Sequence, residues 1–133
     1  MPAHNHPDSV IARARAQSLS AMLIRVAERH GEKTAIICGD VTWSYADFHR
    51  EVERLAAGLR GLGIAPGERI AILARNSHAF IALRFAIARA DTVLVPINFM
   101  LNADEAGYIL RHAGVDIGKM SFLGAIPMTR TAV

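Results

Sequence analysis

The residues that most resemble a catalytic pair are the adjacent Ser77 and His78. A serine nucleophile needs a general base within hydrogen-bond reach of its hydroxyl group. Side chains that are neighbours in sequence at the start of a helix point apart, so this serine and this histidine are not expected to meet. The pair therefore does not predict nucleophilic catalysis.

Two other candidates for acid–base or thiol chemistry are a carboxylate pair and the single cysteine. Glu51 and Glu53 are two residues apart on an expected helix, so they do not face each other and paired-carboxylate chemistry is unsupported. Cys38 is the only cysteine, which excludes an intrachain disulfide. It lies in an apolar strand rather than an electropositive pocket, so we expect a buried structural thiol. A single thiol is compatible with a reducing compartment, and we expect the protein to be cytoplasmic.

Metal and phosphate sites are also weakly indicated. His4 and His6 stand in a tail-like segment, where two histidines make a poor metal site. His112 is expected near a helix C-terminus, where a histidine suits the helix dipole. The chain has no G-x-x-x-x-G-K and no G-x-G-x-x-G phosphate cradle. The glycines that come nearest to such a motif are Gly58, Gly61 and Gly63, but they lie in and after an expected helix and not between a strand and a helix. We therefore predict no catalytic, cofactor-binding or metal-binding residues.

The stretch Arg69 to Asn98 organises the elements that would position any site. Its pattern predicts a strand at Ile70–Leu73, a helix from Ser77 to Ala90 capped by Asn76 or Ser77, and a strand at Thr92–Val95 limited by Pro96. This is a βαβ unit, whose two strands run parallel. Consecutive apolar residues in both strands predict that both faces of the sheet are covered.

The residues before this unit predict two helices and a hairpin. The first helix begins near Ser18 or Ser20 and ends at Gly31. Strands at Thr34–Cys38 and Val41–Ser44 are joined by the two-residue turn Gly39–Asp40, which indicates a hairpin. The spacing of Ser44 and Asp47 is that of a capping box at the start of the second helix. The apolar stripe expected on that helix consists of Phe48, Val52, Leu55, Leu59 and Leu62.

The residues after the unit predict one more helix and the organisation of the chain. Asn102 and Glu105 form a second capping box, and Gly114 ends the helix that it opens. Val115–Ile117 could begin another strand. We expect a flexible lead-in at residues 1–17, a domain at 18–117 and an atypical tail at 118–133, which shows no period.

Composition limits the classes of function. The 133 residues are 52% hydrophobic and 20% charged with a net charge of +3, which indicates a globular protein. The basic residues are nearly all arginines scattered through every segment rather than clustered with aromatics, so nucleic-acid binding is not expected. No apolar run reaches the roughly 18 residues of a membrane span. Strands that need cover on both faces imply partners that this chain does not supply. We therefore expect the isolated chain to expose apolar surface and to self-associate.

Three stretches carry a family resemblance. Thr42 to Phe48 (TWSYADF) resembles the "T-Y-x-E-L" segment near the start of adenylate-forming enzymes. Ala56 to Ser77 resembles their "G-[VI]-x-x-G-D-R-V-A-[IL]-x-x-x-N-S" segment, and Arg89 to Asn98 resembles "A-G-A-V-x-V-P-[IL]-N". The resemblance as a whole covers about residues 18 to 117, and the closest group is the AMP-forming acyl-CoA synthetases.

The resemblance implies an α/β fold: the partial N-terminal region of the adenylate-forming enzyme fold, with a β-hairpin, a short parallel sheet and flanking helices. It implies a parent enzyme that makes an acyl-adenylate from a carboxylic or fatty acid, using ATP, Mg²⁺ and coenzyme A. The family's phosphate loop, its "Y-G-x-T-E" segment, its ribose-binding Asp and its C-terminal Lys would all follow the end of this chain. We therefore expect no cofactor for this chain alone.

Two positions depart from the family pattern. Asp91 stands where the family usually has glycine at a helix-to-strand turn, and Asp tolerates such a turn less well. Met100 stands where many relatives carry Arg near the coenzyme A entrance, so no binding role passes to it. A truncated or frame-shifted reading, or a wrongly placed gene end, is our expectation for the tail.

Three functions follow in order of preference. The first is the N-terminal piece of an acyl-CoA synthetase, inactive by itself. The second is a non-catalytic docking or regulatory module that assembles with a separately encoded remainder or a full-length relative. The third is a small nucleotide-binding α/β protein, which would need a glycine-rich turn where the chain has Ala74 to Ser77.

Overall fold

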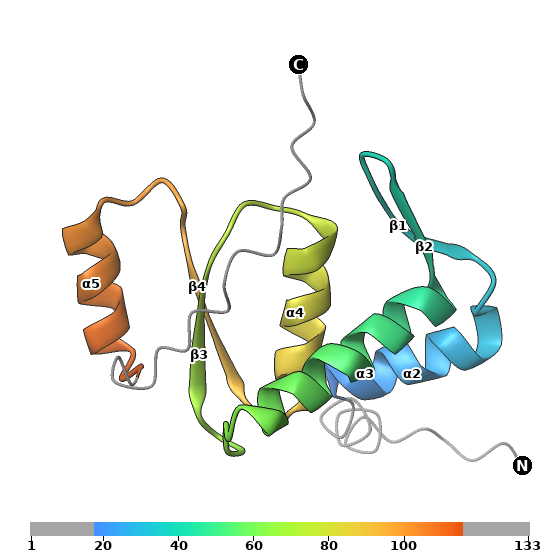
Figure 1. Cartoon of the computed structure of the whole chain (residues 1–133), viewed down its shortest axis with the longest axis horizontal. Helices are drawn as coiled ribbons and strands as arrows, with labels where there is room; N and C mark the ends of the chain where they lie inside the picture. Colours follow the sequence, from blue (N-terminus) through green and yellow to red (C-terminus); the bar gives the residue numbers. More distant parts are fainter. Residues whose placement is uncertain (1–17, 116–133) are drawn as a thin grey trace, which may run out of the picture.

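The fold alternates helices and strands along residues 18–115, which the computed structural model describes (Figure 1). The predicted lead-in at 1–17 and the predicted tail at 118–133 lie outside the described residues. The elements in chain order are α2 (Leu19–His30), β1 (Thr34–Cys38), β2 (Val41–Ser44), α3 (Tyr45–Gly61), β3 (Arg69–Leu73), α4 (His78–Arg89), β4 (Val93–Ile97) and α5 (Ala103–His112). This order confirms the mixed α/β class.

The first helix and the hairpin follow from their terminal residues. Ser18 caps α2, because its hydroxyl oxygen accepts a hydrogen bond from the Ala21 N–H at 3.1 Å. Strands β1 and β2 pair antiparallel, with Cys38 opposite Val41. Gly39 takes a positive φ of 58° in the turn between them, a conformation that glycine adopts without steric cost. The predicted hairpin is therefore confirmed.

The capping box of α3 is also present. The Ser44 hydroxyl accepts from the Asp47 N–H, and the Asp47 carboxylate accepts from the Ser44 N–H, each at 3.1 Å. The buried stripe of α3 consists of Phe48, Val52, Ala56 and Leu59. The prediction that Leu62 belongs to this stripe is wrong, since its side chain is 51% exposed. Leu62 is the C-cap of α3 and lies beyond the last turn that packs on the core.

Strands β3 and β4 form a parallel pair, as the βαβ pattern predicts. Arg69 pairs with Val93, and the register continues to Leu73 opposite Ile97. The prediction that Pro96 limits the second strand is wrong, because β4 includes Pro96 opposite Ile72 and ends at Ile97. Proline is tolerated on an edge strand when its nitrogen faces away from the partner. Among the described strands, β4 has β3 as its single neighbour, so this condition can be met.

The core lies where α2, α3 and α4 meet one face of the parallel pair. It is formed by Leu23, Phe48, Val52, Ala56, Leu59, Ile72, Ala82, Leu83, Ala86, Ile87 and Ala90. The alanines Ala56, Ala82 and Ala86 are 0% exposed, and their small side chains allow α3 and α4 to pack closely. The ring of Phe48 meets that of Phe85 edge-to-face at a centroid distance of 5.0 Å. Helix α4 thus has neighbours on several sides.

Three helices end in the same hydrogen-bonded turn, with the residue after the C-cap at positive φ. In α3 this residue is Gly63 and in α5 it is Gly114, with φ of 78° and 65°. In α4 it is Asp91, with φ of 58°. Its N–H donates to the carbonyl of Ala88, and the Thr92 N–H donates to that of Ile87. The helix-to-strand turn expected at Asp91 is therefore present, with a non-glycine residue in the left-handed region.

The two faces of the parallel sheet are covered unequally. Residues alternate between faces along a strand, so Ile72 lies on the core face and Leu73 on the other. Helix α4 lies on one side of the strands and α5 on the opposite side (Figure 1). Helix α5 has no fully buried residue, and on its side Leu73 and Val93 are 59% and 47% exposed. Ile97, opposite Leu73 on this second face, is nevertheless 5% exposed, and Ala71 and Val95 are half-buried. The prediction that both faces are covered therefore holds for the core face and for only part of the second face within residues 18–115.

Candidate functional site

The carboxyl ends of β3 and β4 bring two loops together. The guanidinium group of Arg75, which follows β3, lies over the ring of Phe99, which follows β4, at 5.2 Å from the ring centroid. In the second loop the side-chain oxygen of Asn98 accepts a hydrogen bond from the Met100 N–H at 3.0 Å. Open α/β sheets bind ligands outside the carboxyl ends of their strands, which makes this edge the candidate site.

The chemistry available at this edge is limited to attraction of charge. Arg75 supplies a permanent positive charge, and the Asn98 side-chain oxygen already accepts a backbone hydrogen bond. Met100 is 78% exposed and carries no charge. None of these groups can act as a nucleophile or a general base at neutral pH. The Arg75–Phe99 contact was not predicted from the sequence, although the expected parallel pairing of the two strands was a signal for it.

Ser77 and His78 have separate environments, as expected. The Ser77 hydroxyl oxygen caps α4 by accepting from the Phe80 N–H at 3.1 Å. The His78 ring lies edge-on to the Trp43 ring at 5.0 Å, and its Nδ1 atom is buried without a hydrogen-bond partner. The structure therefore brings His78 to an aromatic side chain and not to the serine.

Glu51 and Glu53 belong to different ion pairs. Arg54 donates from Nε to Glu51 at 2.9 Å, and this hydrogen bond lowers the pKa of Glu51. Arg89 donates from Nε to Glu53 at 2.6 Å and lowers the pKa of Glu53. A general acid needs a raised pKa to hold its proton near neutrality. Neither carboxylate meets this requirement, and the two do not form a pair.

The remaining candidates have structural positions. Cys38 is half-buried at the end of β1 rather than fully buried. His112 lies in the last turn of α5, where its ring stacks on that of Tyr108 at a centroid distance of 5.7 Å. His4 and His6 lie outside the described residues. Among residues 18–115 no group of three or more His, Cys, Asp and Glu side chains could hold a metal ion.

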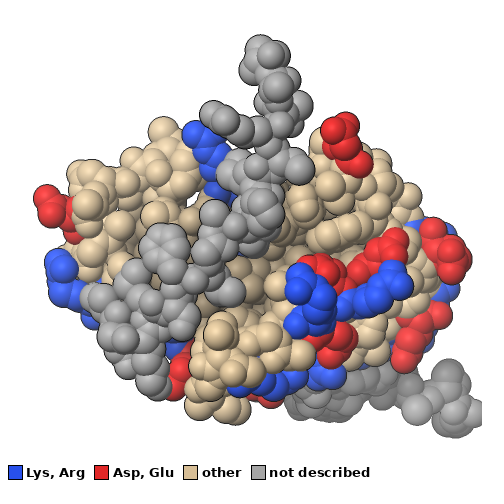
Figure 2. All heavy atoms as spheres, in the orientation of Figure 1, with Lys and Arg blue, Asp and Glu red and all other residues tan. Residues whose placement is uncertain are grey.

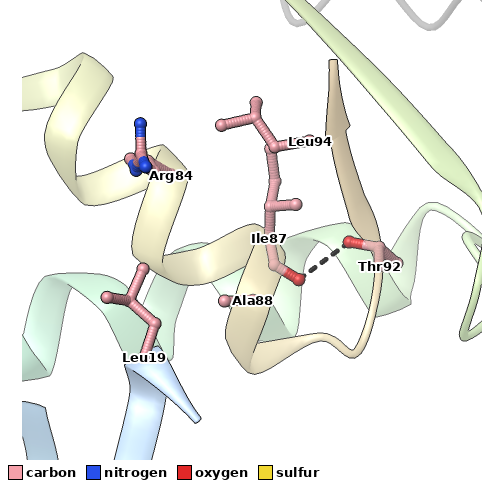
Figure 3. Close-up of a pocket in the computed structure, with 6 residues that line it drawn as sticks. All are labelled: Leu19, Arg84, Ile87, Ala88, Thr92 and Leu94. Carbon is pink, nitrogen blue, oxygen red and sulfur yellow. Dashed lines mark hydrogen bonds between the residues drawn. The ribbon is translucent and has the colours of Figure 1, made fainter. Parts of the chain in front are cut away.

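A small pocket lies where α2 begins beside α4 and β4 (Figure 3). Its volume is about 170 Å³, which is smaller than typical ligand pockets. The Thr92 hydroxyl group is committed to the Ile87 carbonyl oxygen at 2.8 Å, as the dashed line in Figure 3 shows. The lining residues are Leu19, Arg84, Ile87, Ala88, Thr92 and Leu94. One arginine and a threonine whose hydroxyl group is already hydrogen-bonded provide no acid–base or nucleophilic chemistry.

The described residues do not fit ATP. Acidic and basic side chains alternate over the helical side of the molecule (Figure 2), and the arginines of α3 are committed to neighbours, as in the pairs Arg50–Asp47 and Arg54–Glu51. The turn between β3 and α4 has no glycine that would let a phosphate approach the backbone. Phosphoryl and adenylyl transfer needs several donors gathered around the phosphates. Residues 18–115 also contain no helix long and apolar enough to cross a membrane.

Comparison with known proteins places these elements in a family of larger enzymes. The family model described as "AMP-binding enzyme" matches residues 23–118. A fatty acid–[acyl-carrier-protein] ligase from Streptomyces coeruleorubidus is 38% identical over 88 residues, which are 66% of this chain and 17% of that protein. A feruloyl-CoA synthase from an Amycolatopsis species is 37% identical over 103 residues, or 77% of this chain and 21% of that protein. The chain thus spans about a fifth of the length of these relatives.

Solved structures agree with this assignment. The N-terminal domain of FACL13 from Mycobacterium tuberculosis is 35% identical with a TM-score of 0.72, and the match covers 74% of this chain and 26% of that domain. The N-terminal subdomain of NpsA from Klebsiella oxytoca shares the fold at 21% identity, with a TM-score of 0.72. That match covers 74% of this chain and 26% of the NpsA chain. Because the family model spans well over half of the chain, the protein belongs to the AMP-binding enzyme family.

Proposed function

We propose that this chain serves as the N-terminal part of an ATP-dependent acid–CoA ligase, which activates a carboxylic or fatty acid through an acyl-adenylate. The observation that carries the proposal is the family match over residues 23–118. Relatives named as ligases of fatty acids, and as a synthase of feruloyl-CoA, support the acid as substrate and coenzyme A as acceptor. The proposed location is the cytoplasm.

The chain alone is proposed to be inactive. Catalysis of adenylyl transfer comes from positioning and from charge stabilisation around the phosphates. Residues 18–115 offer scattered arginines and one exposed cation at the candidate edge, Arg75. Surface charges of this kind attract ATP weakly and are screened by salt.

The test is a pair of activity measurements. Purified chain with ATP, Mg²⁺, a panel of carboxylic acids and coenzyme A is expected to release no pyrophosphate above the enzyme-free blank. In the second measurement, residues 18–115 replace the matched segment of the Amycolatopsis feruloyl-CoA synthase, and the same synthase lacking that segment is the control.

The two measurements have separate outcomes. A chimaera with ferulate-dependent pyrophosphate release, beside an inactive deletion control, is the expected result. A folded but inactive chimaera would count against the proposal. Acid-dependent release by the isolated chain would contradict its inactivity.

A second candidate function is a non-catalytic docking or regulatory module that assembles with a separately encoded remainder or with a full-length relative. The observation that favours it is the exposed apolar surface on one side of the parallel pair, including Leu73 and Val93. Pyrophosphate release that appears only when a second polypeptide carrying the phosphate loop is added to the chain would identify this role.

A further inference from the structure

The small pocket beside α2 lies at the amino end of β4, away from the candidate edge where Arg75 meets Phe99. Arg75 and Phe99 follow the last residues of β3 and β4, whereas Thr92 comes just before β4 and Leu94 is its second residue. Figure 3 shows that the lining side chains come from α2, α4 and the beginning of β4 and surround one space. The pocket is therefore a site separate from that edge.

Three of the lining side chains are aliphatic and come from three different elements. Ile87 of α4 is 1% exposed, and Leu19 of α2 and Leu94 of β4 are half-buried. Together with Ala88 they form a surface on which a hydrocarbon chain loses contact with water. The pocket volume of about 170 Å³ is below the range of about 300–1,000 Å³ for drug-sized ligands, so such a chain must be short.

The polar side chain that remains available in the pocket is Arg84. The Thr92 hydroxyl group donates its proton to the Ile87 carbonyl oxygen at 2.8 Å, so it cannot also donate to a ligand. The side chain of Arg84 is exposed, and no described residue forms a hydrogen bond or an ion pair with its guanidinium group. The pocket thus combines an aliphatic surface with one unpaired cation.

The other arginines of α3 and α4 have partners. Arg50 and Arg54 are each paired with the carboxylate three residues before them. Arg60 donates to the carbonyl oxygen of Arg89 at 2.6 Å, and Arg89 donates to a carboxylate of α3 at the same distance. Helix α4 contains no acidic residue, so Arg84 has no carboxylate on its own helix. An anion that enters the pocket would therefore meet a guanidinium group that has no described counter-ion.

We propose that this pocket binds a short aliphatic chain that carries an anionic head group, such as a carboxylate or a sulfate. Arg84 binds the head group through paired hydrogen bonds, the geometry that a guanidinium group favours with these anions. The chain lies against Ile87 and Leu94. An uncharged alcohol of the same length leaves the guanidinium group unpaired, and a small anion without a chain leaves the aliphatic surface in water. The proposal does not rest on the ligase function.

NMR titrations of the full-length chain test the site through its backbone amide shifts. Hexanoate and hexyl sulfate carry both the chain and the charge, whereas hexanol lacks the charge and acetate lacks the chain. At low ionic strength and neutral pH, hexanoate is expected to shift the amides of residues 84–94 with a Kd of about 1–10 mM. Hexanol and acetate should bind at least about fivefold more weakly. Whichever of hexanoate and hexyl sulfate binds more tightly identifies the preferred head group, and either order supports the proposal.

Three variants locate the binding. Arg84→Gln removes the charge at an exposed position, so it is expected to keep the fold and to weaken hexanoate binding at least about fivefold, with hexanol binding unchanged. Arg29→Gln removes the same charge from an exposed position in the last turn of α2 and should change hexanoate binding by less than about twofold. Ala88→Leu adds a larger side chain to the lining and should abolish binding of both ligands. Circular dichroism of each variant checks the fold.

Several results would overturn the proposal. Equal affinities for hexanoate and hexanol would show that the head group is not recognised, and equal affinities for hexanoate and acetate would show that the chain is not. Equal losses in Arg84→Gln and Arg29→Gln would show a general effect of charge rather than a site. The absence of saturable shifts at residues 84–94 would exclude binding in the pocket. Because the readout is binding and not turnover, failure here is distinguishable from failure of the ligase proposal.

Discussion

The N–H of Gly67 donates a hydrogen bond of 2.8 Å to the carbonyl oxygen of Asp91. Gly67 lies in the turn before β3 and Asp91 in the turn before β4, and both have positive φ, 82° and 58°. The bond ties the two turns together just before the strands begin. The next backbone bond, from the Val93 N–H to the Glu68 carbonyl at 2.8 Å, then starts the ladder. The conformation of Asp91 therefore helps to set the register of the parallel pair.

The first prediction concerns Asp91 itself. Asp91→Gly is expected to raise the free energy of unfolding by about 0.5–1 kcal/mol, because glycine removes the strain of the left-handed conformation, partly offset by a more flexible unfolded chain. It also removes a negative charge from the C-terminal end of α4. Urea unfolding of the two proteins measures the change.

Two variants separate these causes. Asp91→Asn removes the charge while keeping a side chain that tolerates positive φ, so it should gain less than the glycine variant. Gly63→Ala, at the matched position after α3 with φ of 78°, should lose about 1 kcal/mol. A destabilised Asp91→Gly variant would show that the aspartate side chain has a favourable role that outweighs its backbone strain.

The second prediction concerns the contact between α3 and α4. Leu59 is 2% exposed, and Leu59→Ala is expected to cost about 2–5 kcal/mol because it leaves a cavity between the helices. The matched control is Leu62→Ala at the end of the same helix, where the side chain is 51% exposed and a change within about 0.5 kcal/mol is expected. Thermal unfolding followed by circular dichroism compares them, and equal losses would contradict the position of the core.

The third prediction concerns the ion pair between Glu53 and Arg89. The hydrogen bond from Arg89 lowers the pKa of Glu53 in the folded chain below its ordinary value of 4.5. The unfolded chain therefore binds the proton more readily. The contribution to stability is complete above pH 4.5 and disappears as the pH falls through the lower pKa of the folded state.

Glu53→Gln is accordingly expected to lose about 0.5 kcal/mol at pH 7, a small value because both side chains of the pair are more than one third exposed. The difference from the unmodified chain should shrink when the melting temperatures are measured at acid pH. Glu28→Gln, at an exposed position on α2, is the control. A deficit that is the same at neutral and acid pH would show that the glutamine acts through packing rather than charge.

The fourth prediction concerns the predicted tail. Because no period places the apolar residues of 118–133 on one face, deletion of this segment is expected to reduce the free energy of unfolding by less than about 2 kcal/mol, the scale of one core residue. Denaturant unfolding of the two lengths of chain gives the difference. A larger loss would show that the tail belongs to the domain.

Features of the fold that depend on neighbours in sequence were predictable. The capping boxes at Ser44 and Asn102 need partners three residues away, and both are formed as their spacing indicates. The turn at Asp91 was likewise expected from its place between a helix and a strand.

Features that depend on distant segments were not predictable from local pattern. Leu62 fits the period of α3, but its exposure depends on where the packing against α4 ends. Pro96 usually ends a strand, but it is accepted because no described strand lies on its outer side. The Arg75–Phe99 contact joins two loops that meet only after the strands have paired in parallel.

The incomplete burial of α5 has a consequence for the time scale on which parts of the chain open. A helix without a fully buried residue can unfold without exposing the core, whereas α3 and α4 share most of the core residues and must open together. Amide hydrogens of α5 should therefore exchange with solvent deuterium through a local opening of low free energy. Those of α3 and α4 should exchange through the global unfolding reaction. In solution the amide hydrogens of α3 and α4 would then exchange slowly. Helix α5 would open and close many times between two global unfolding events of the chain.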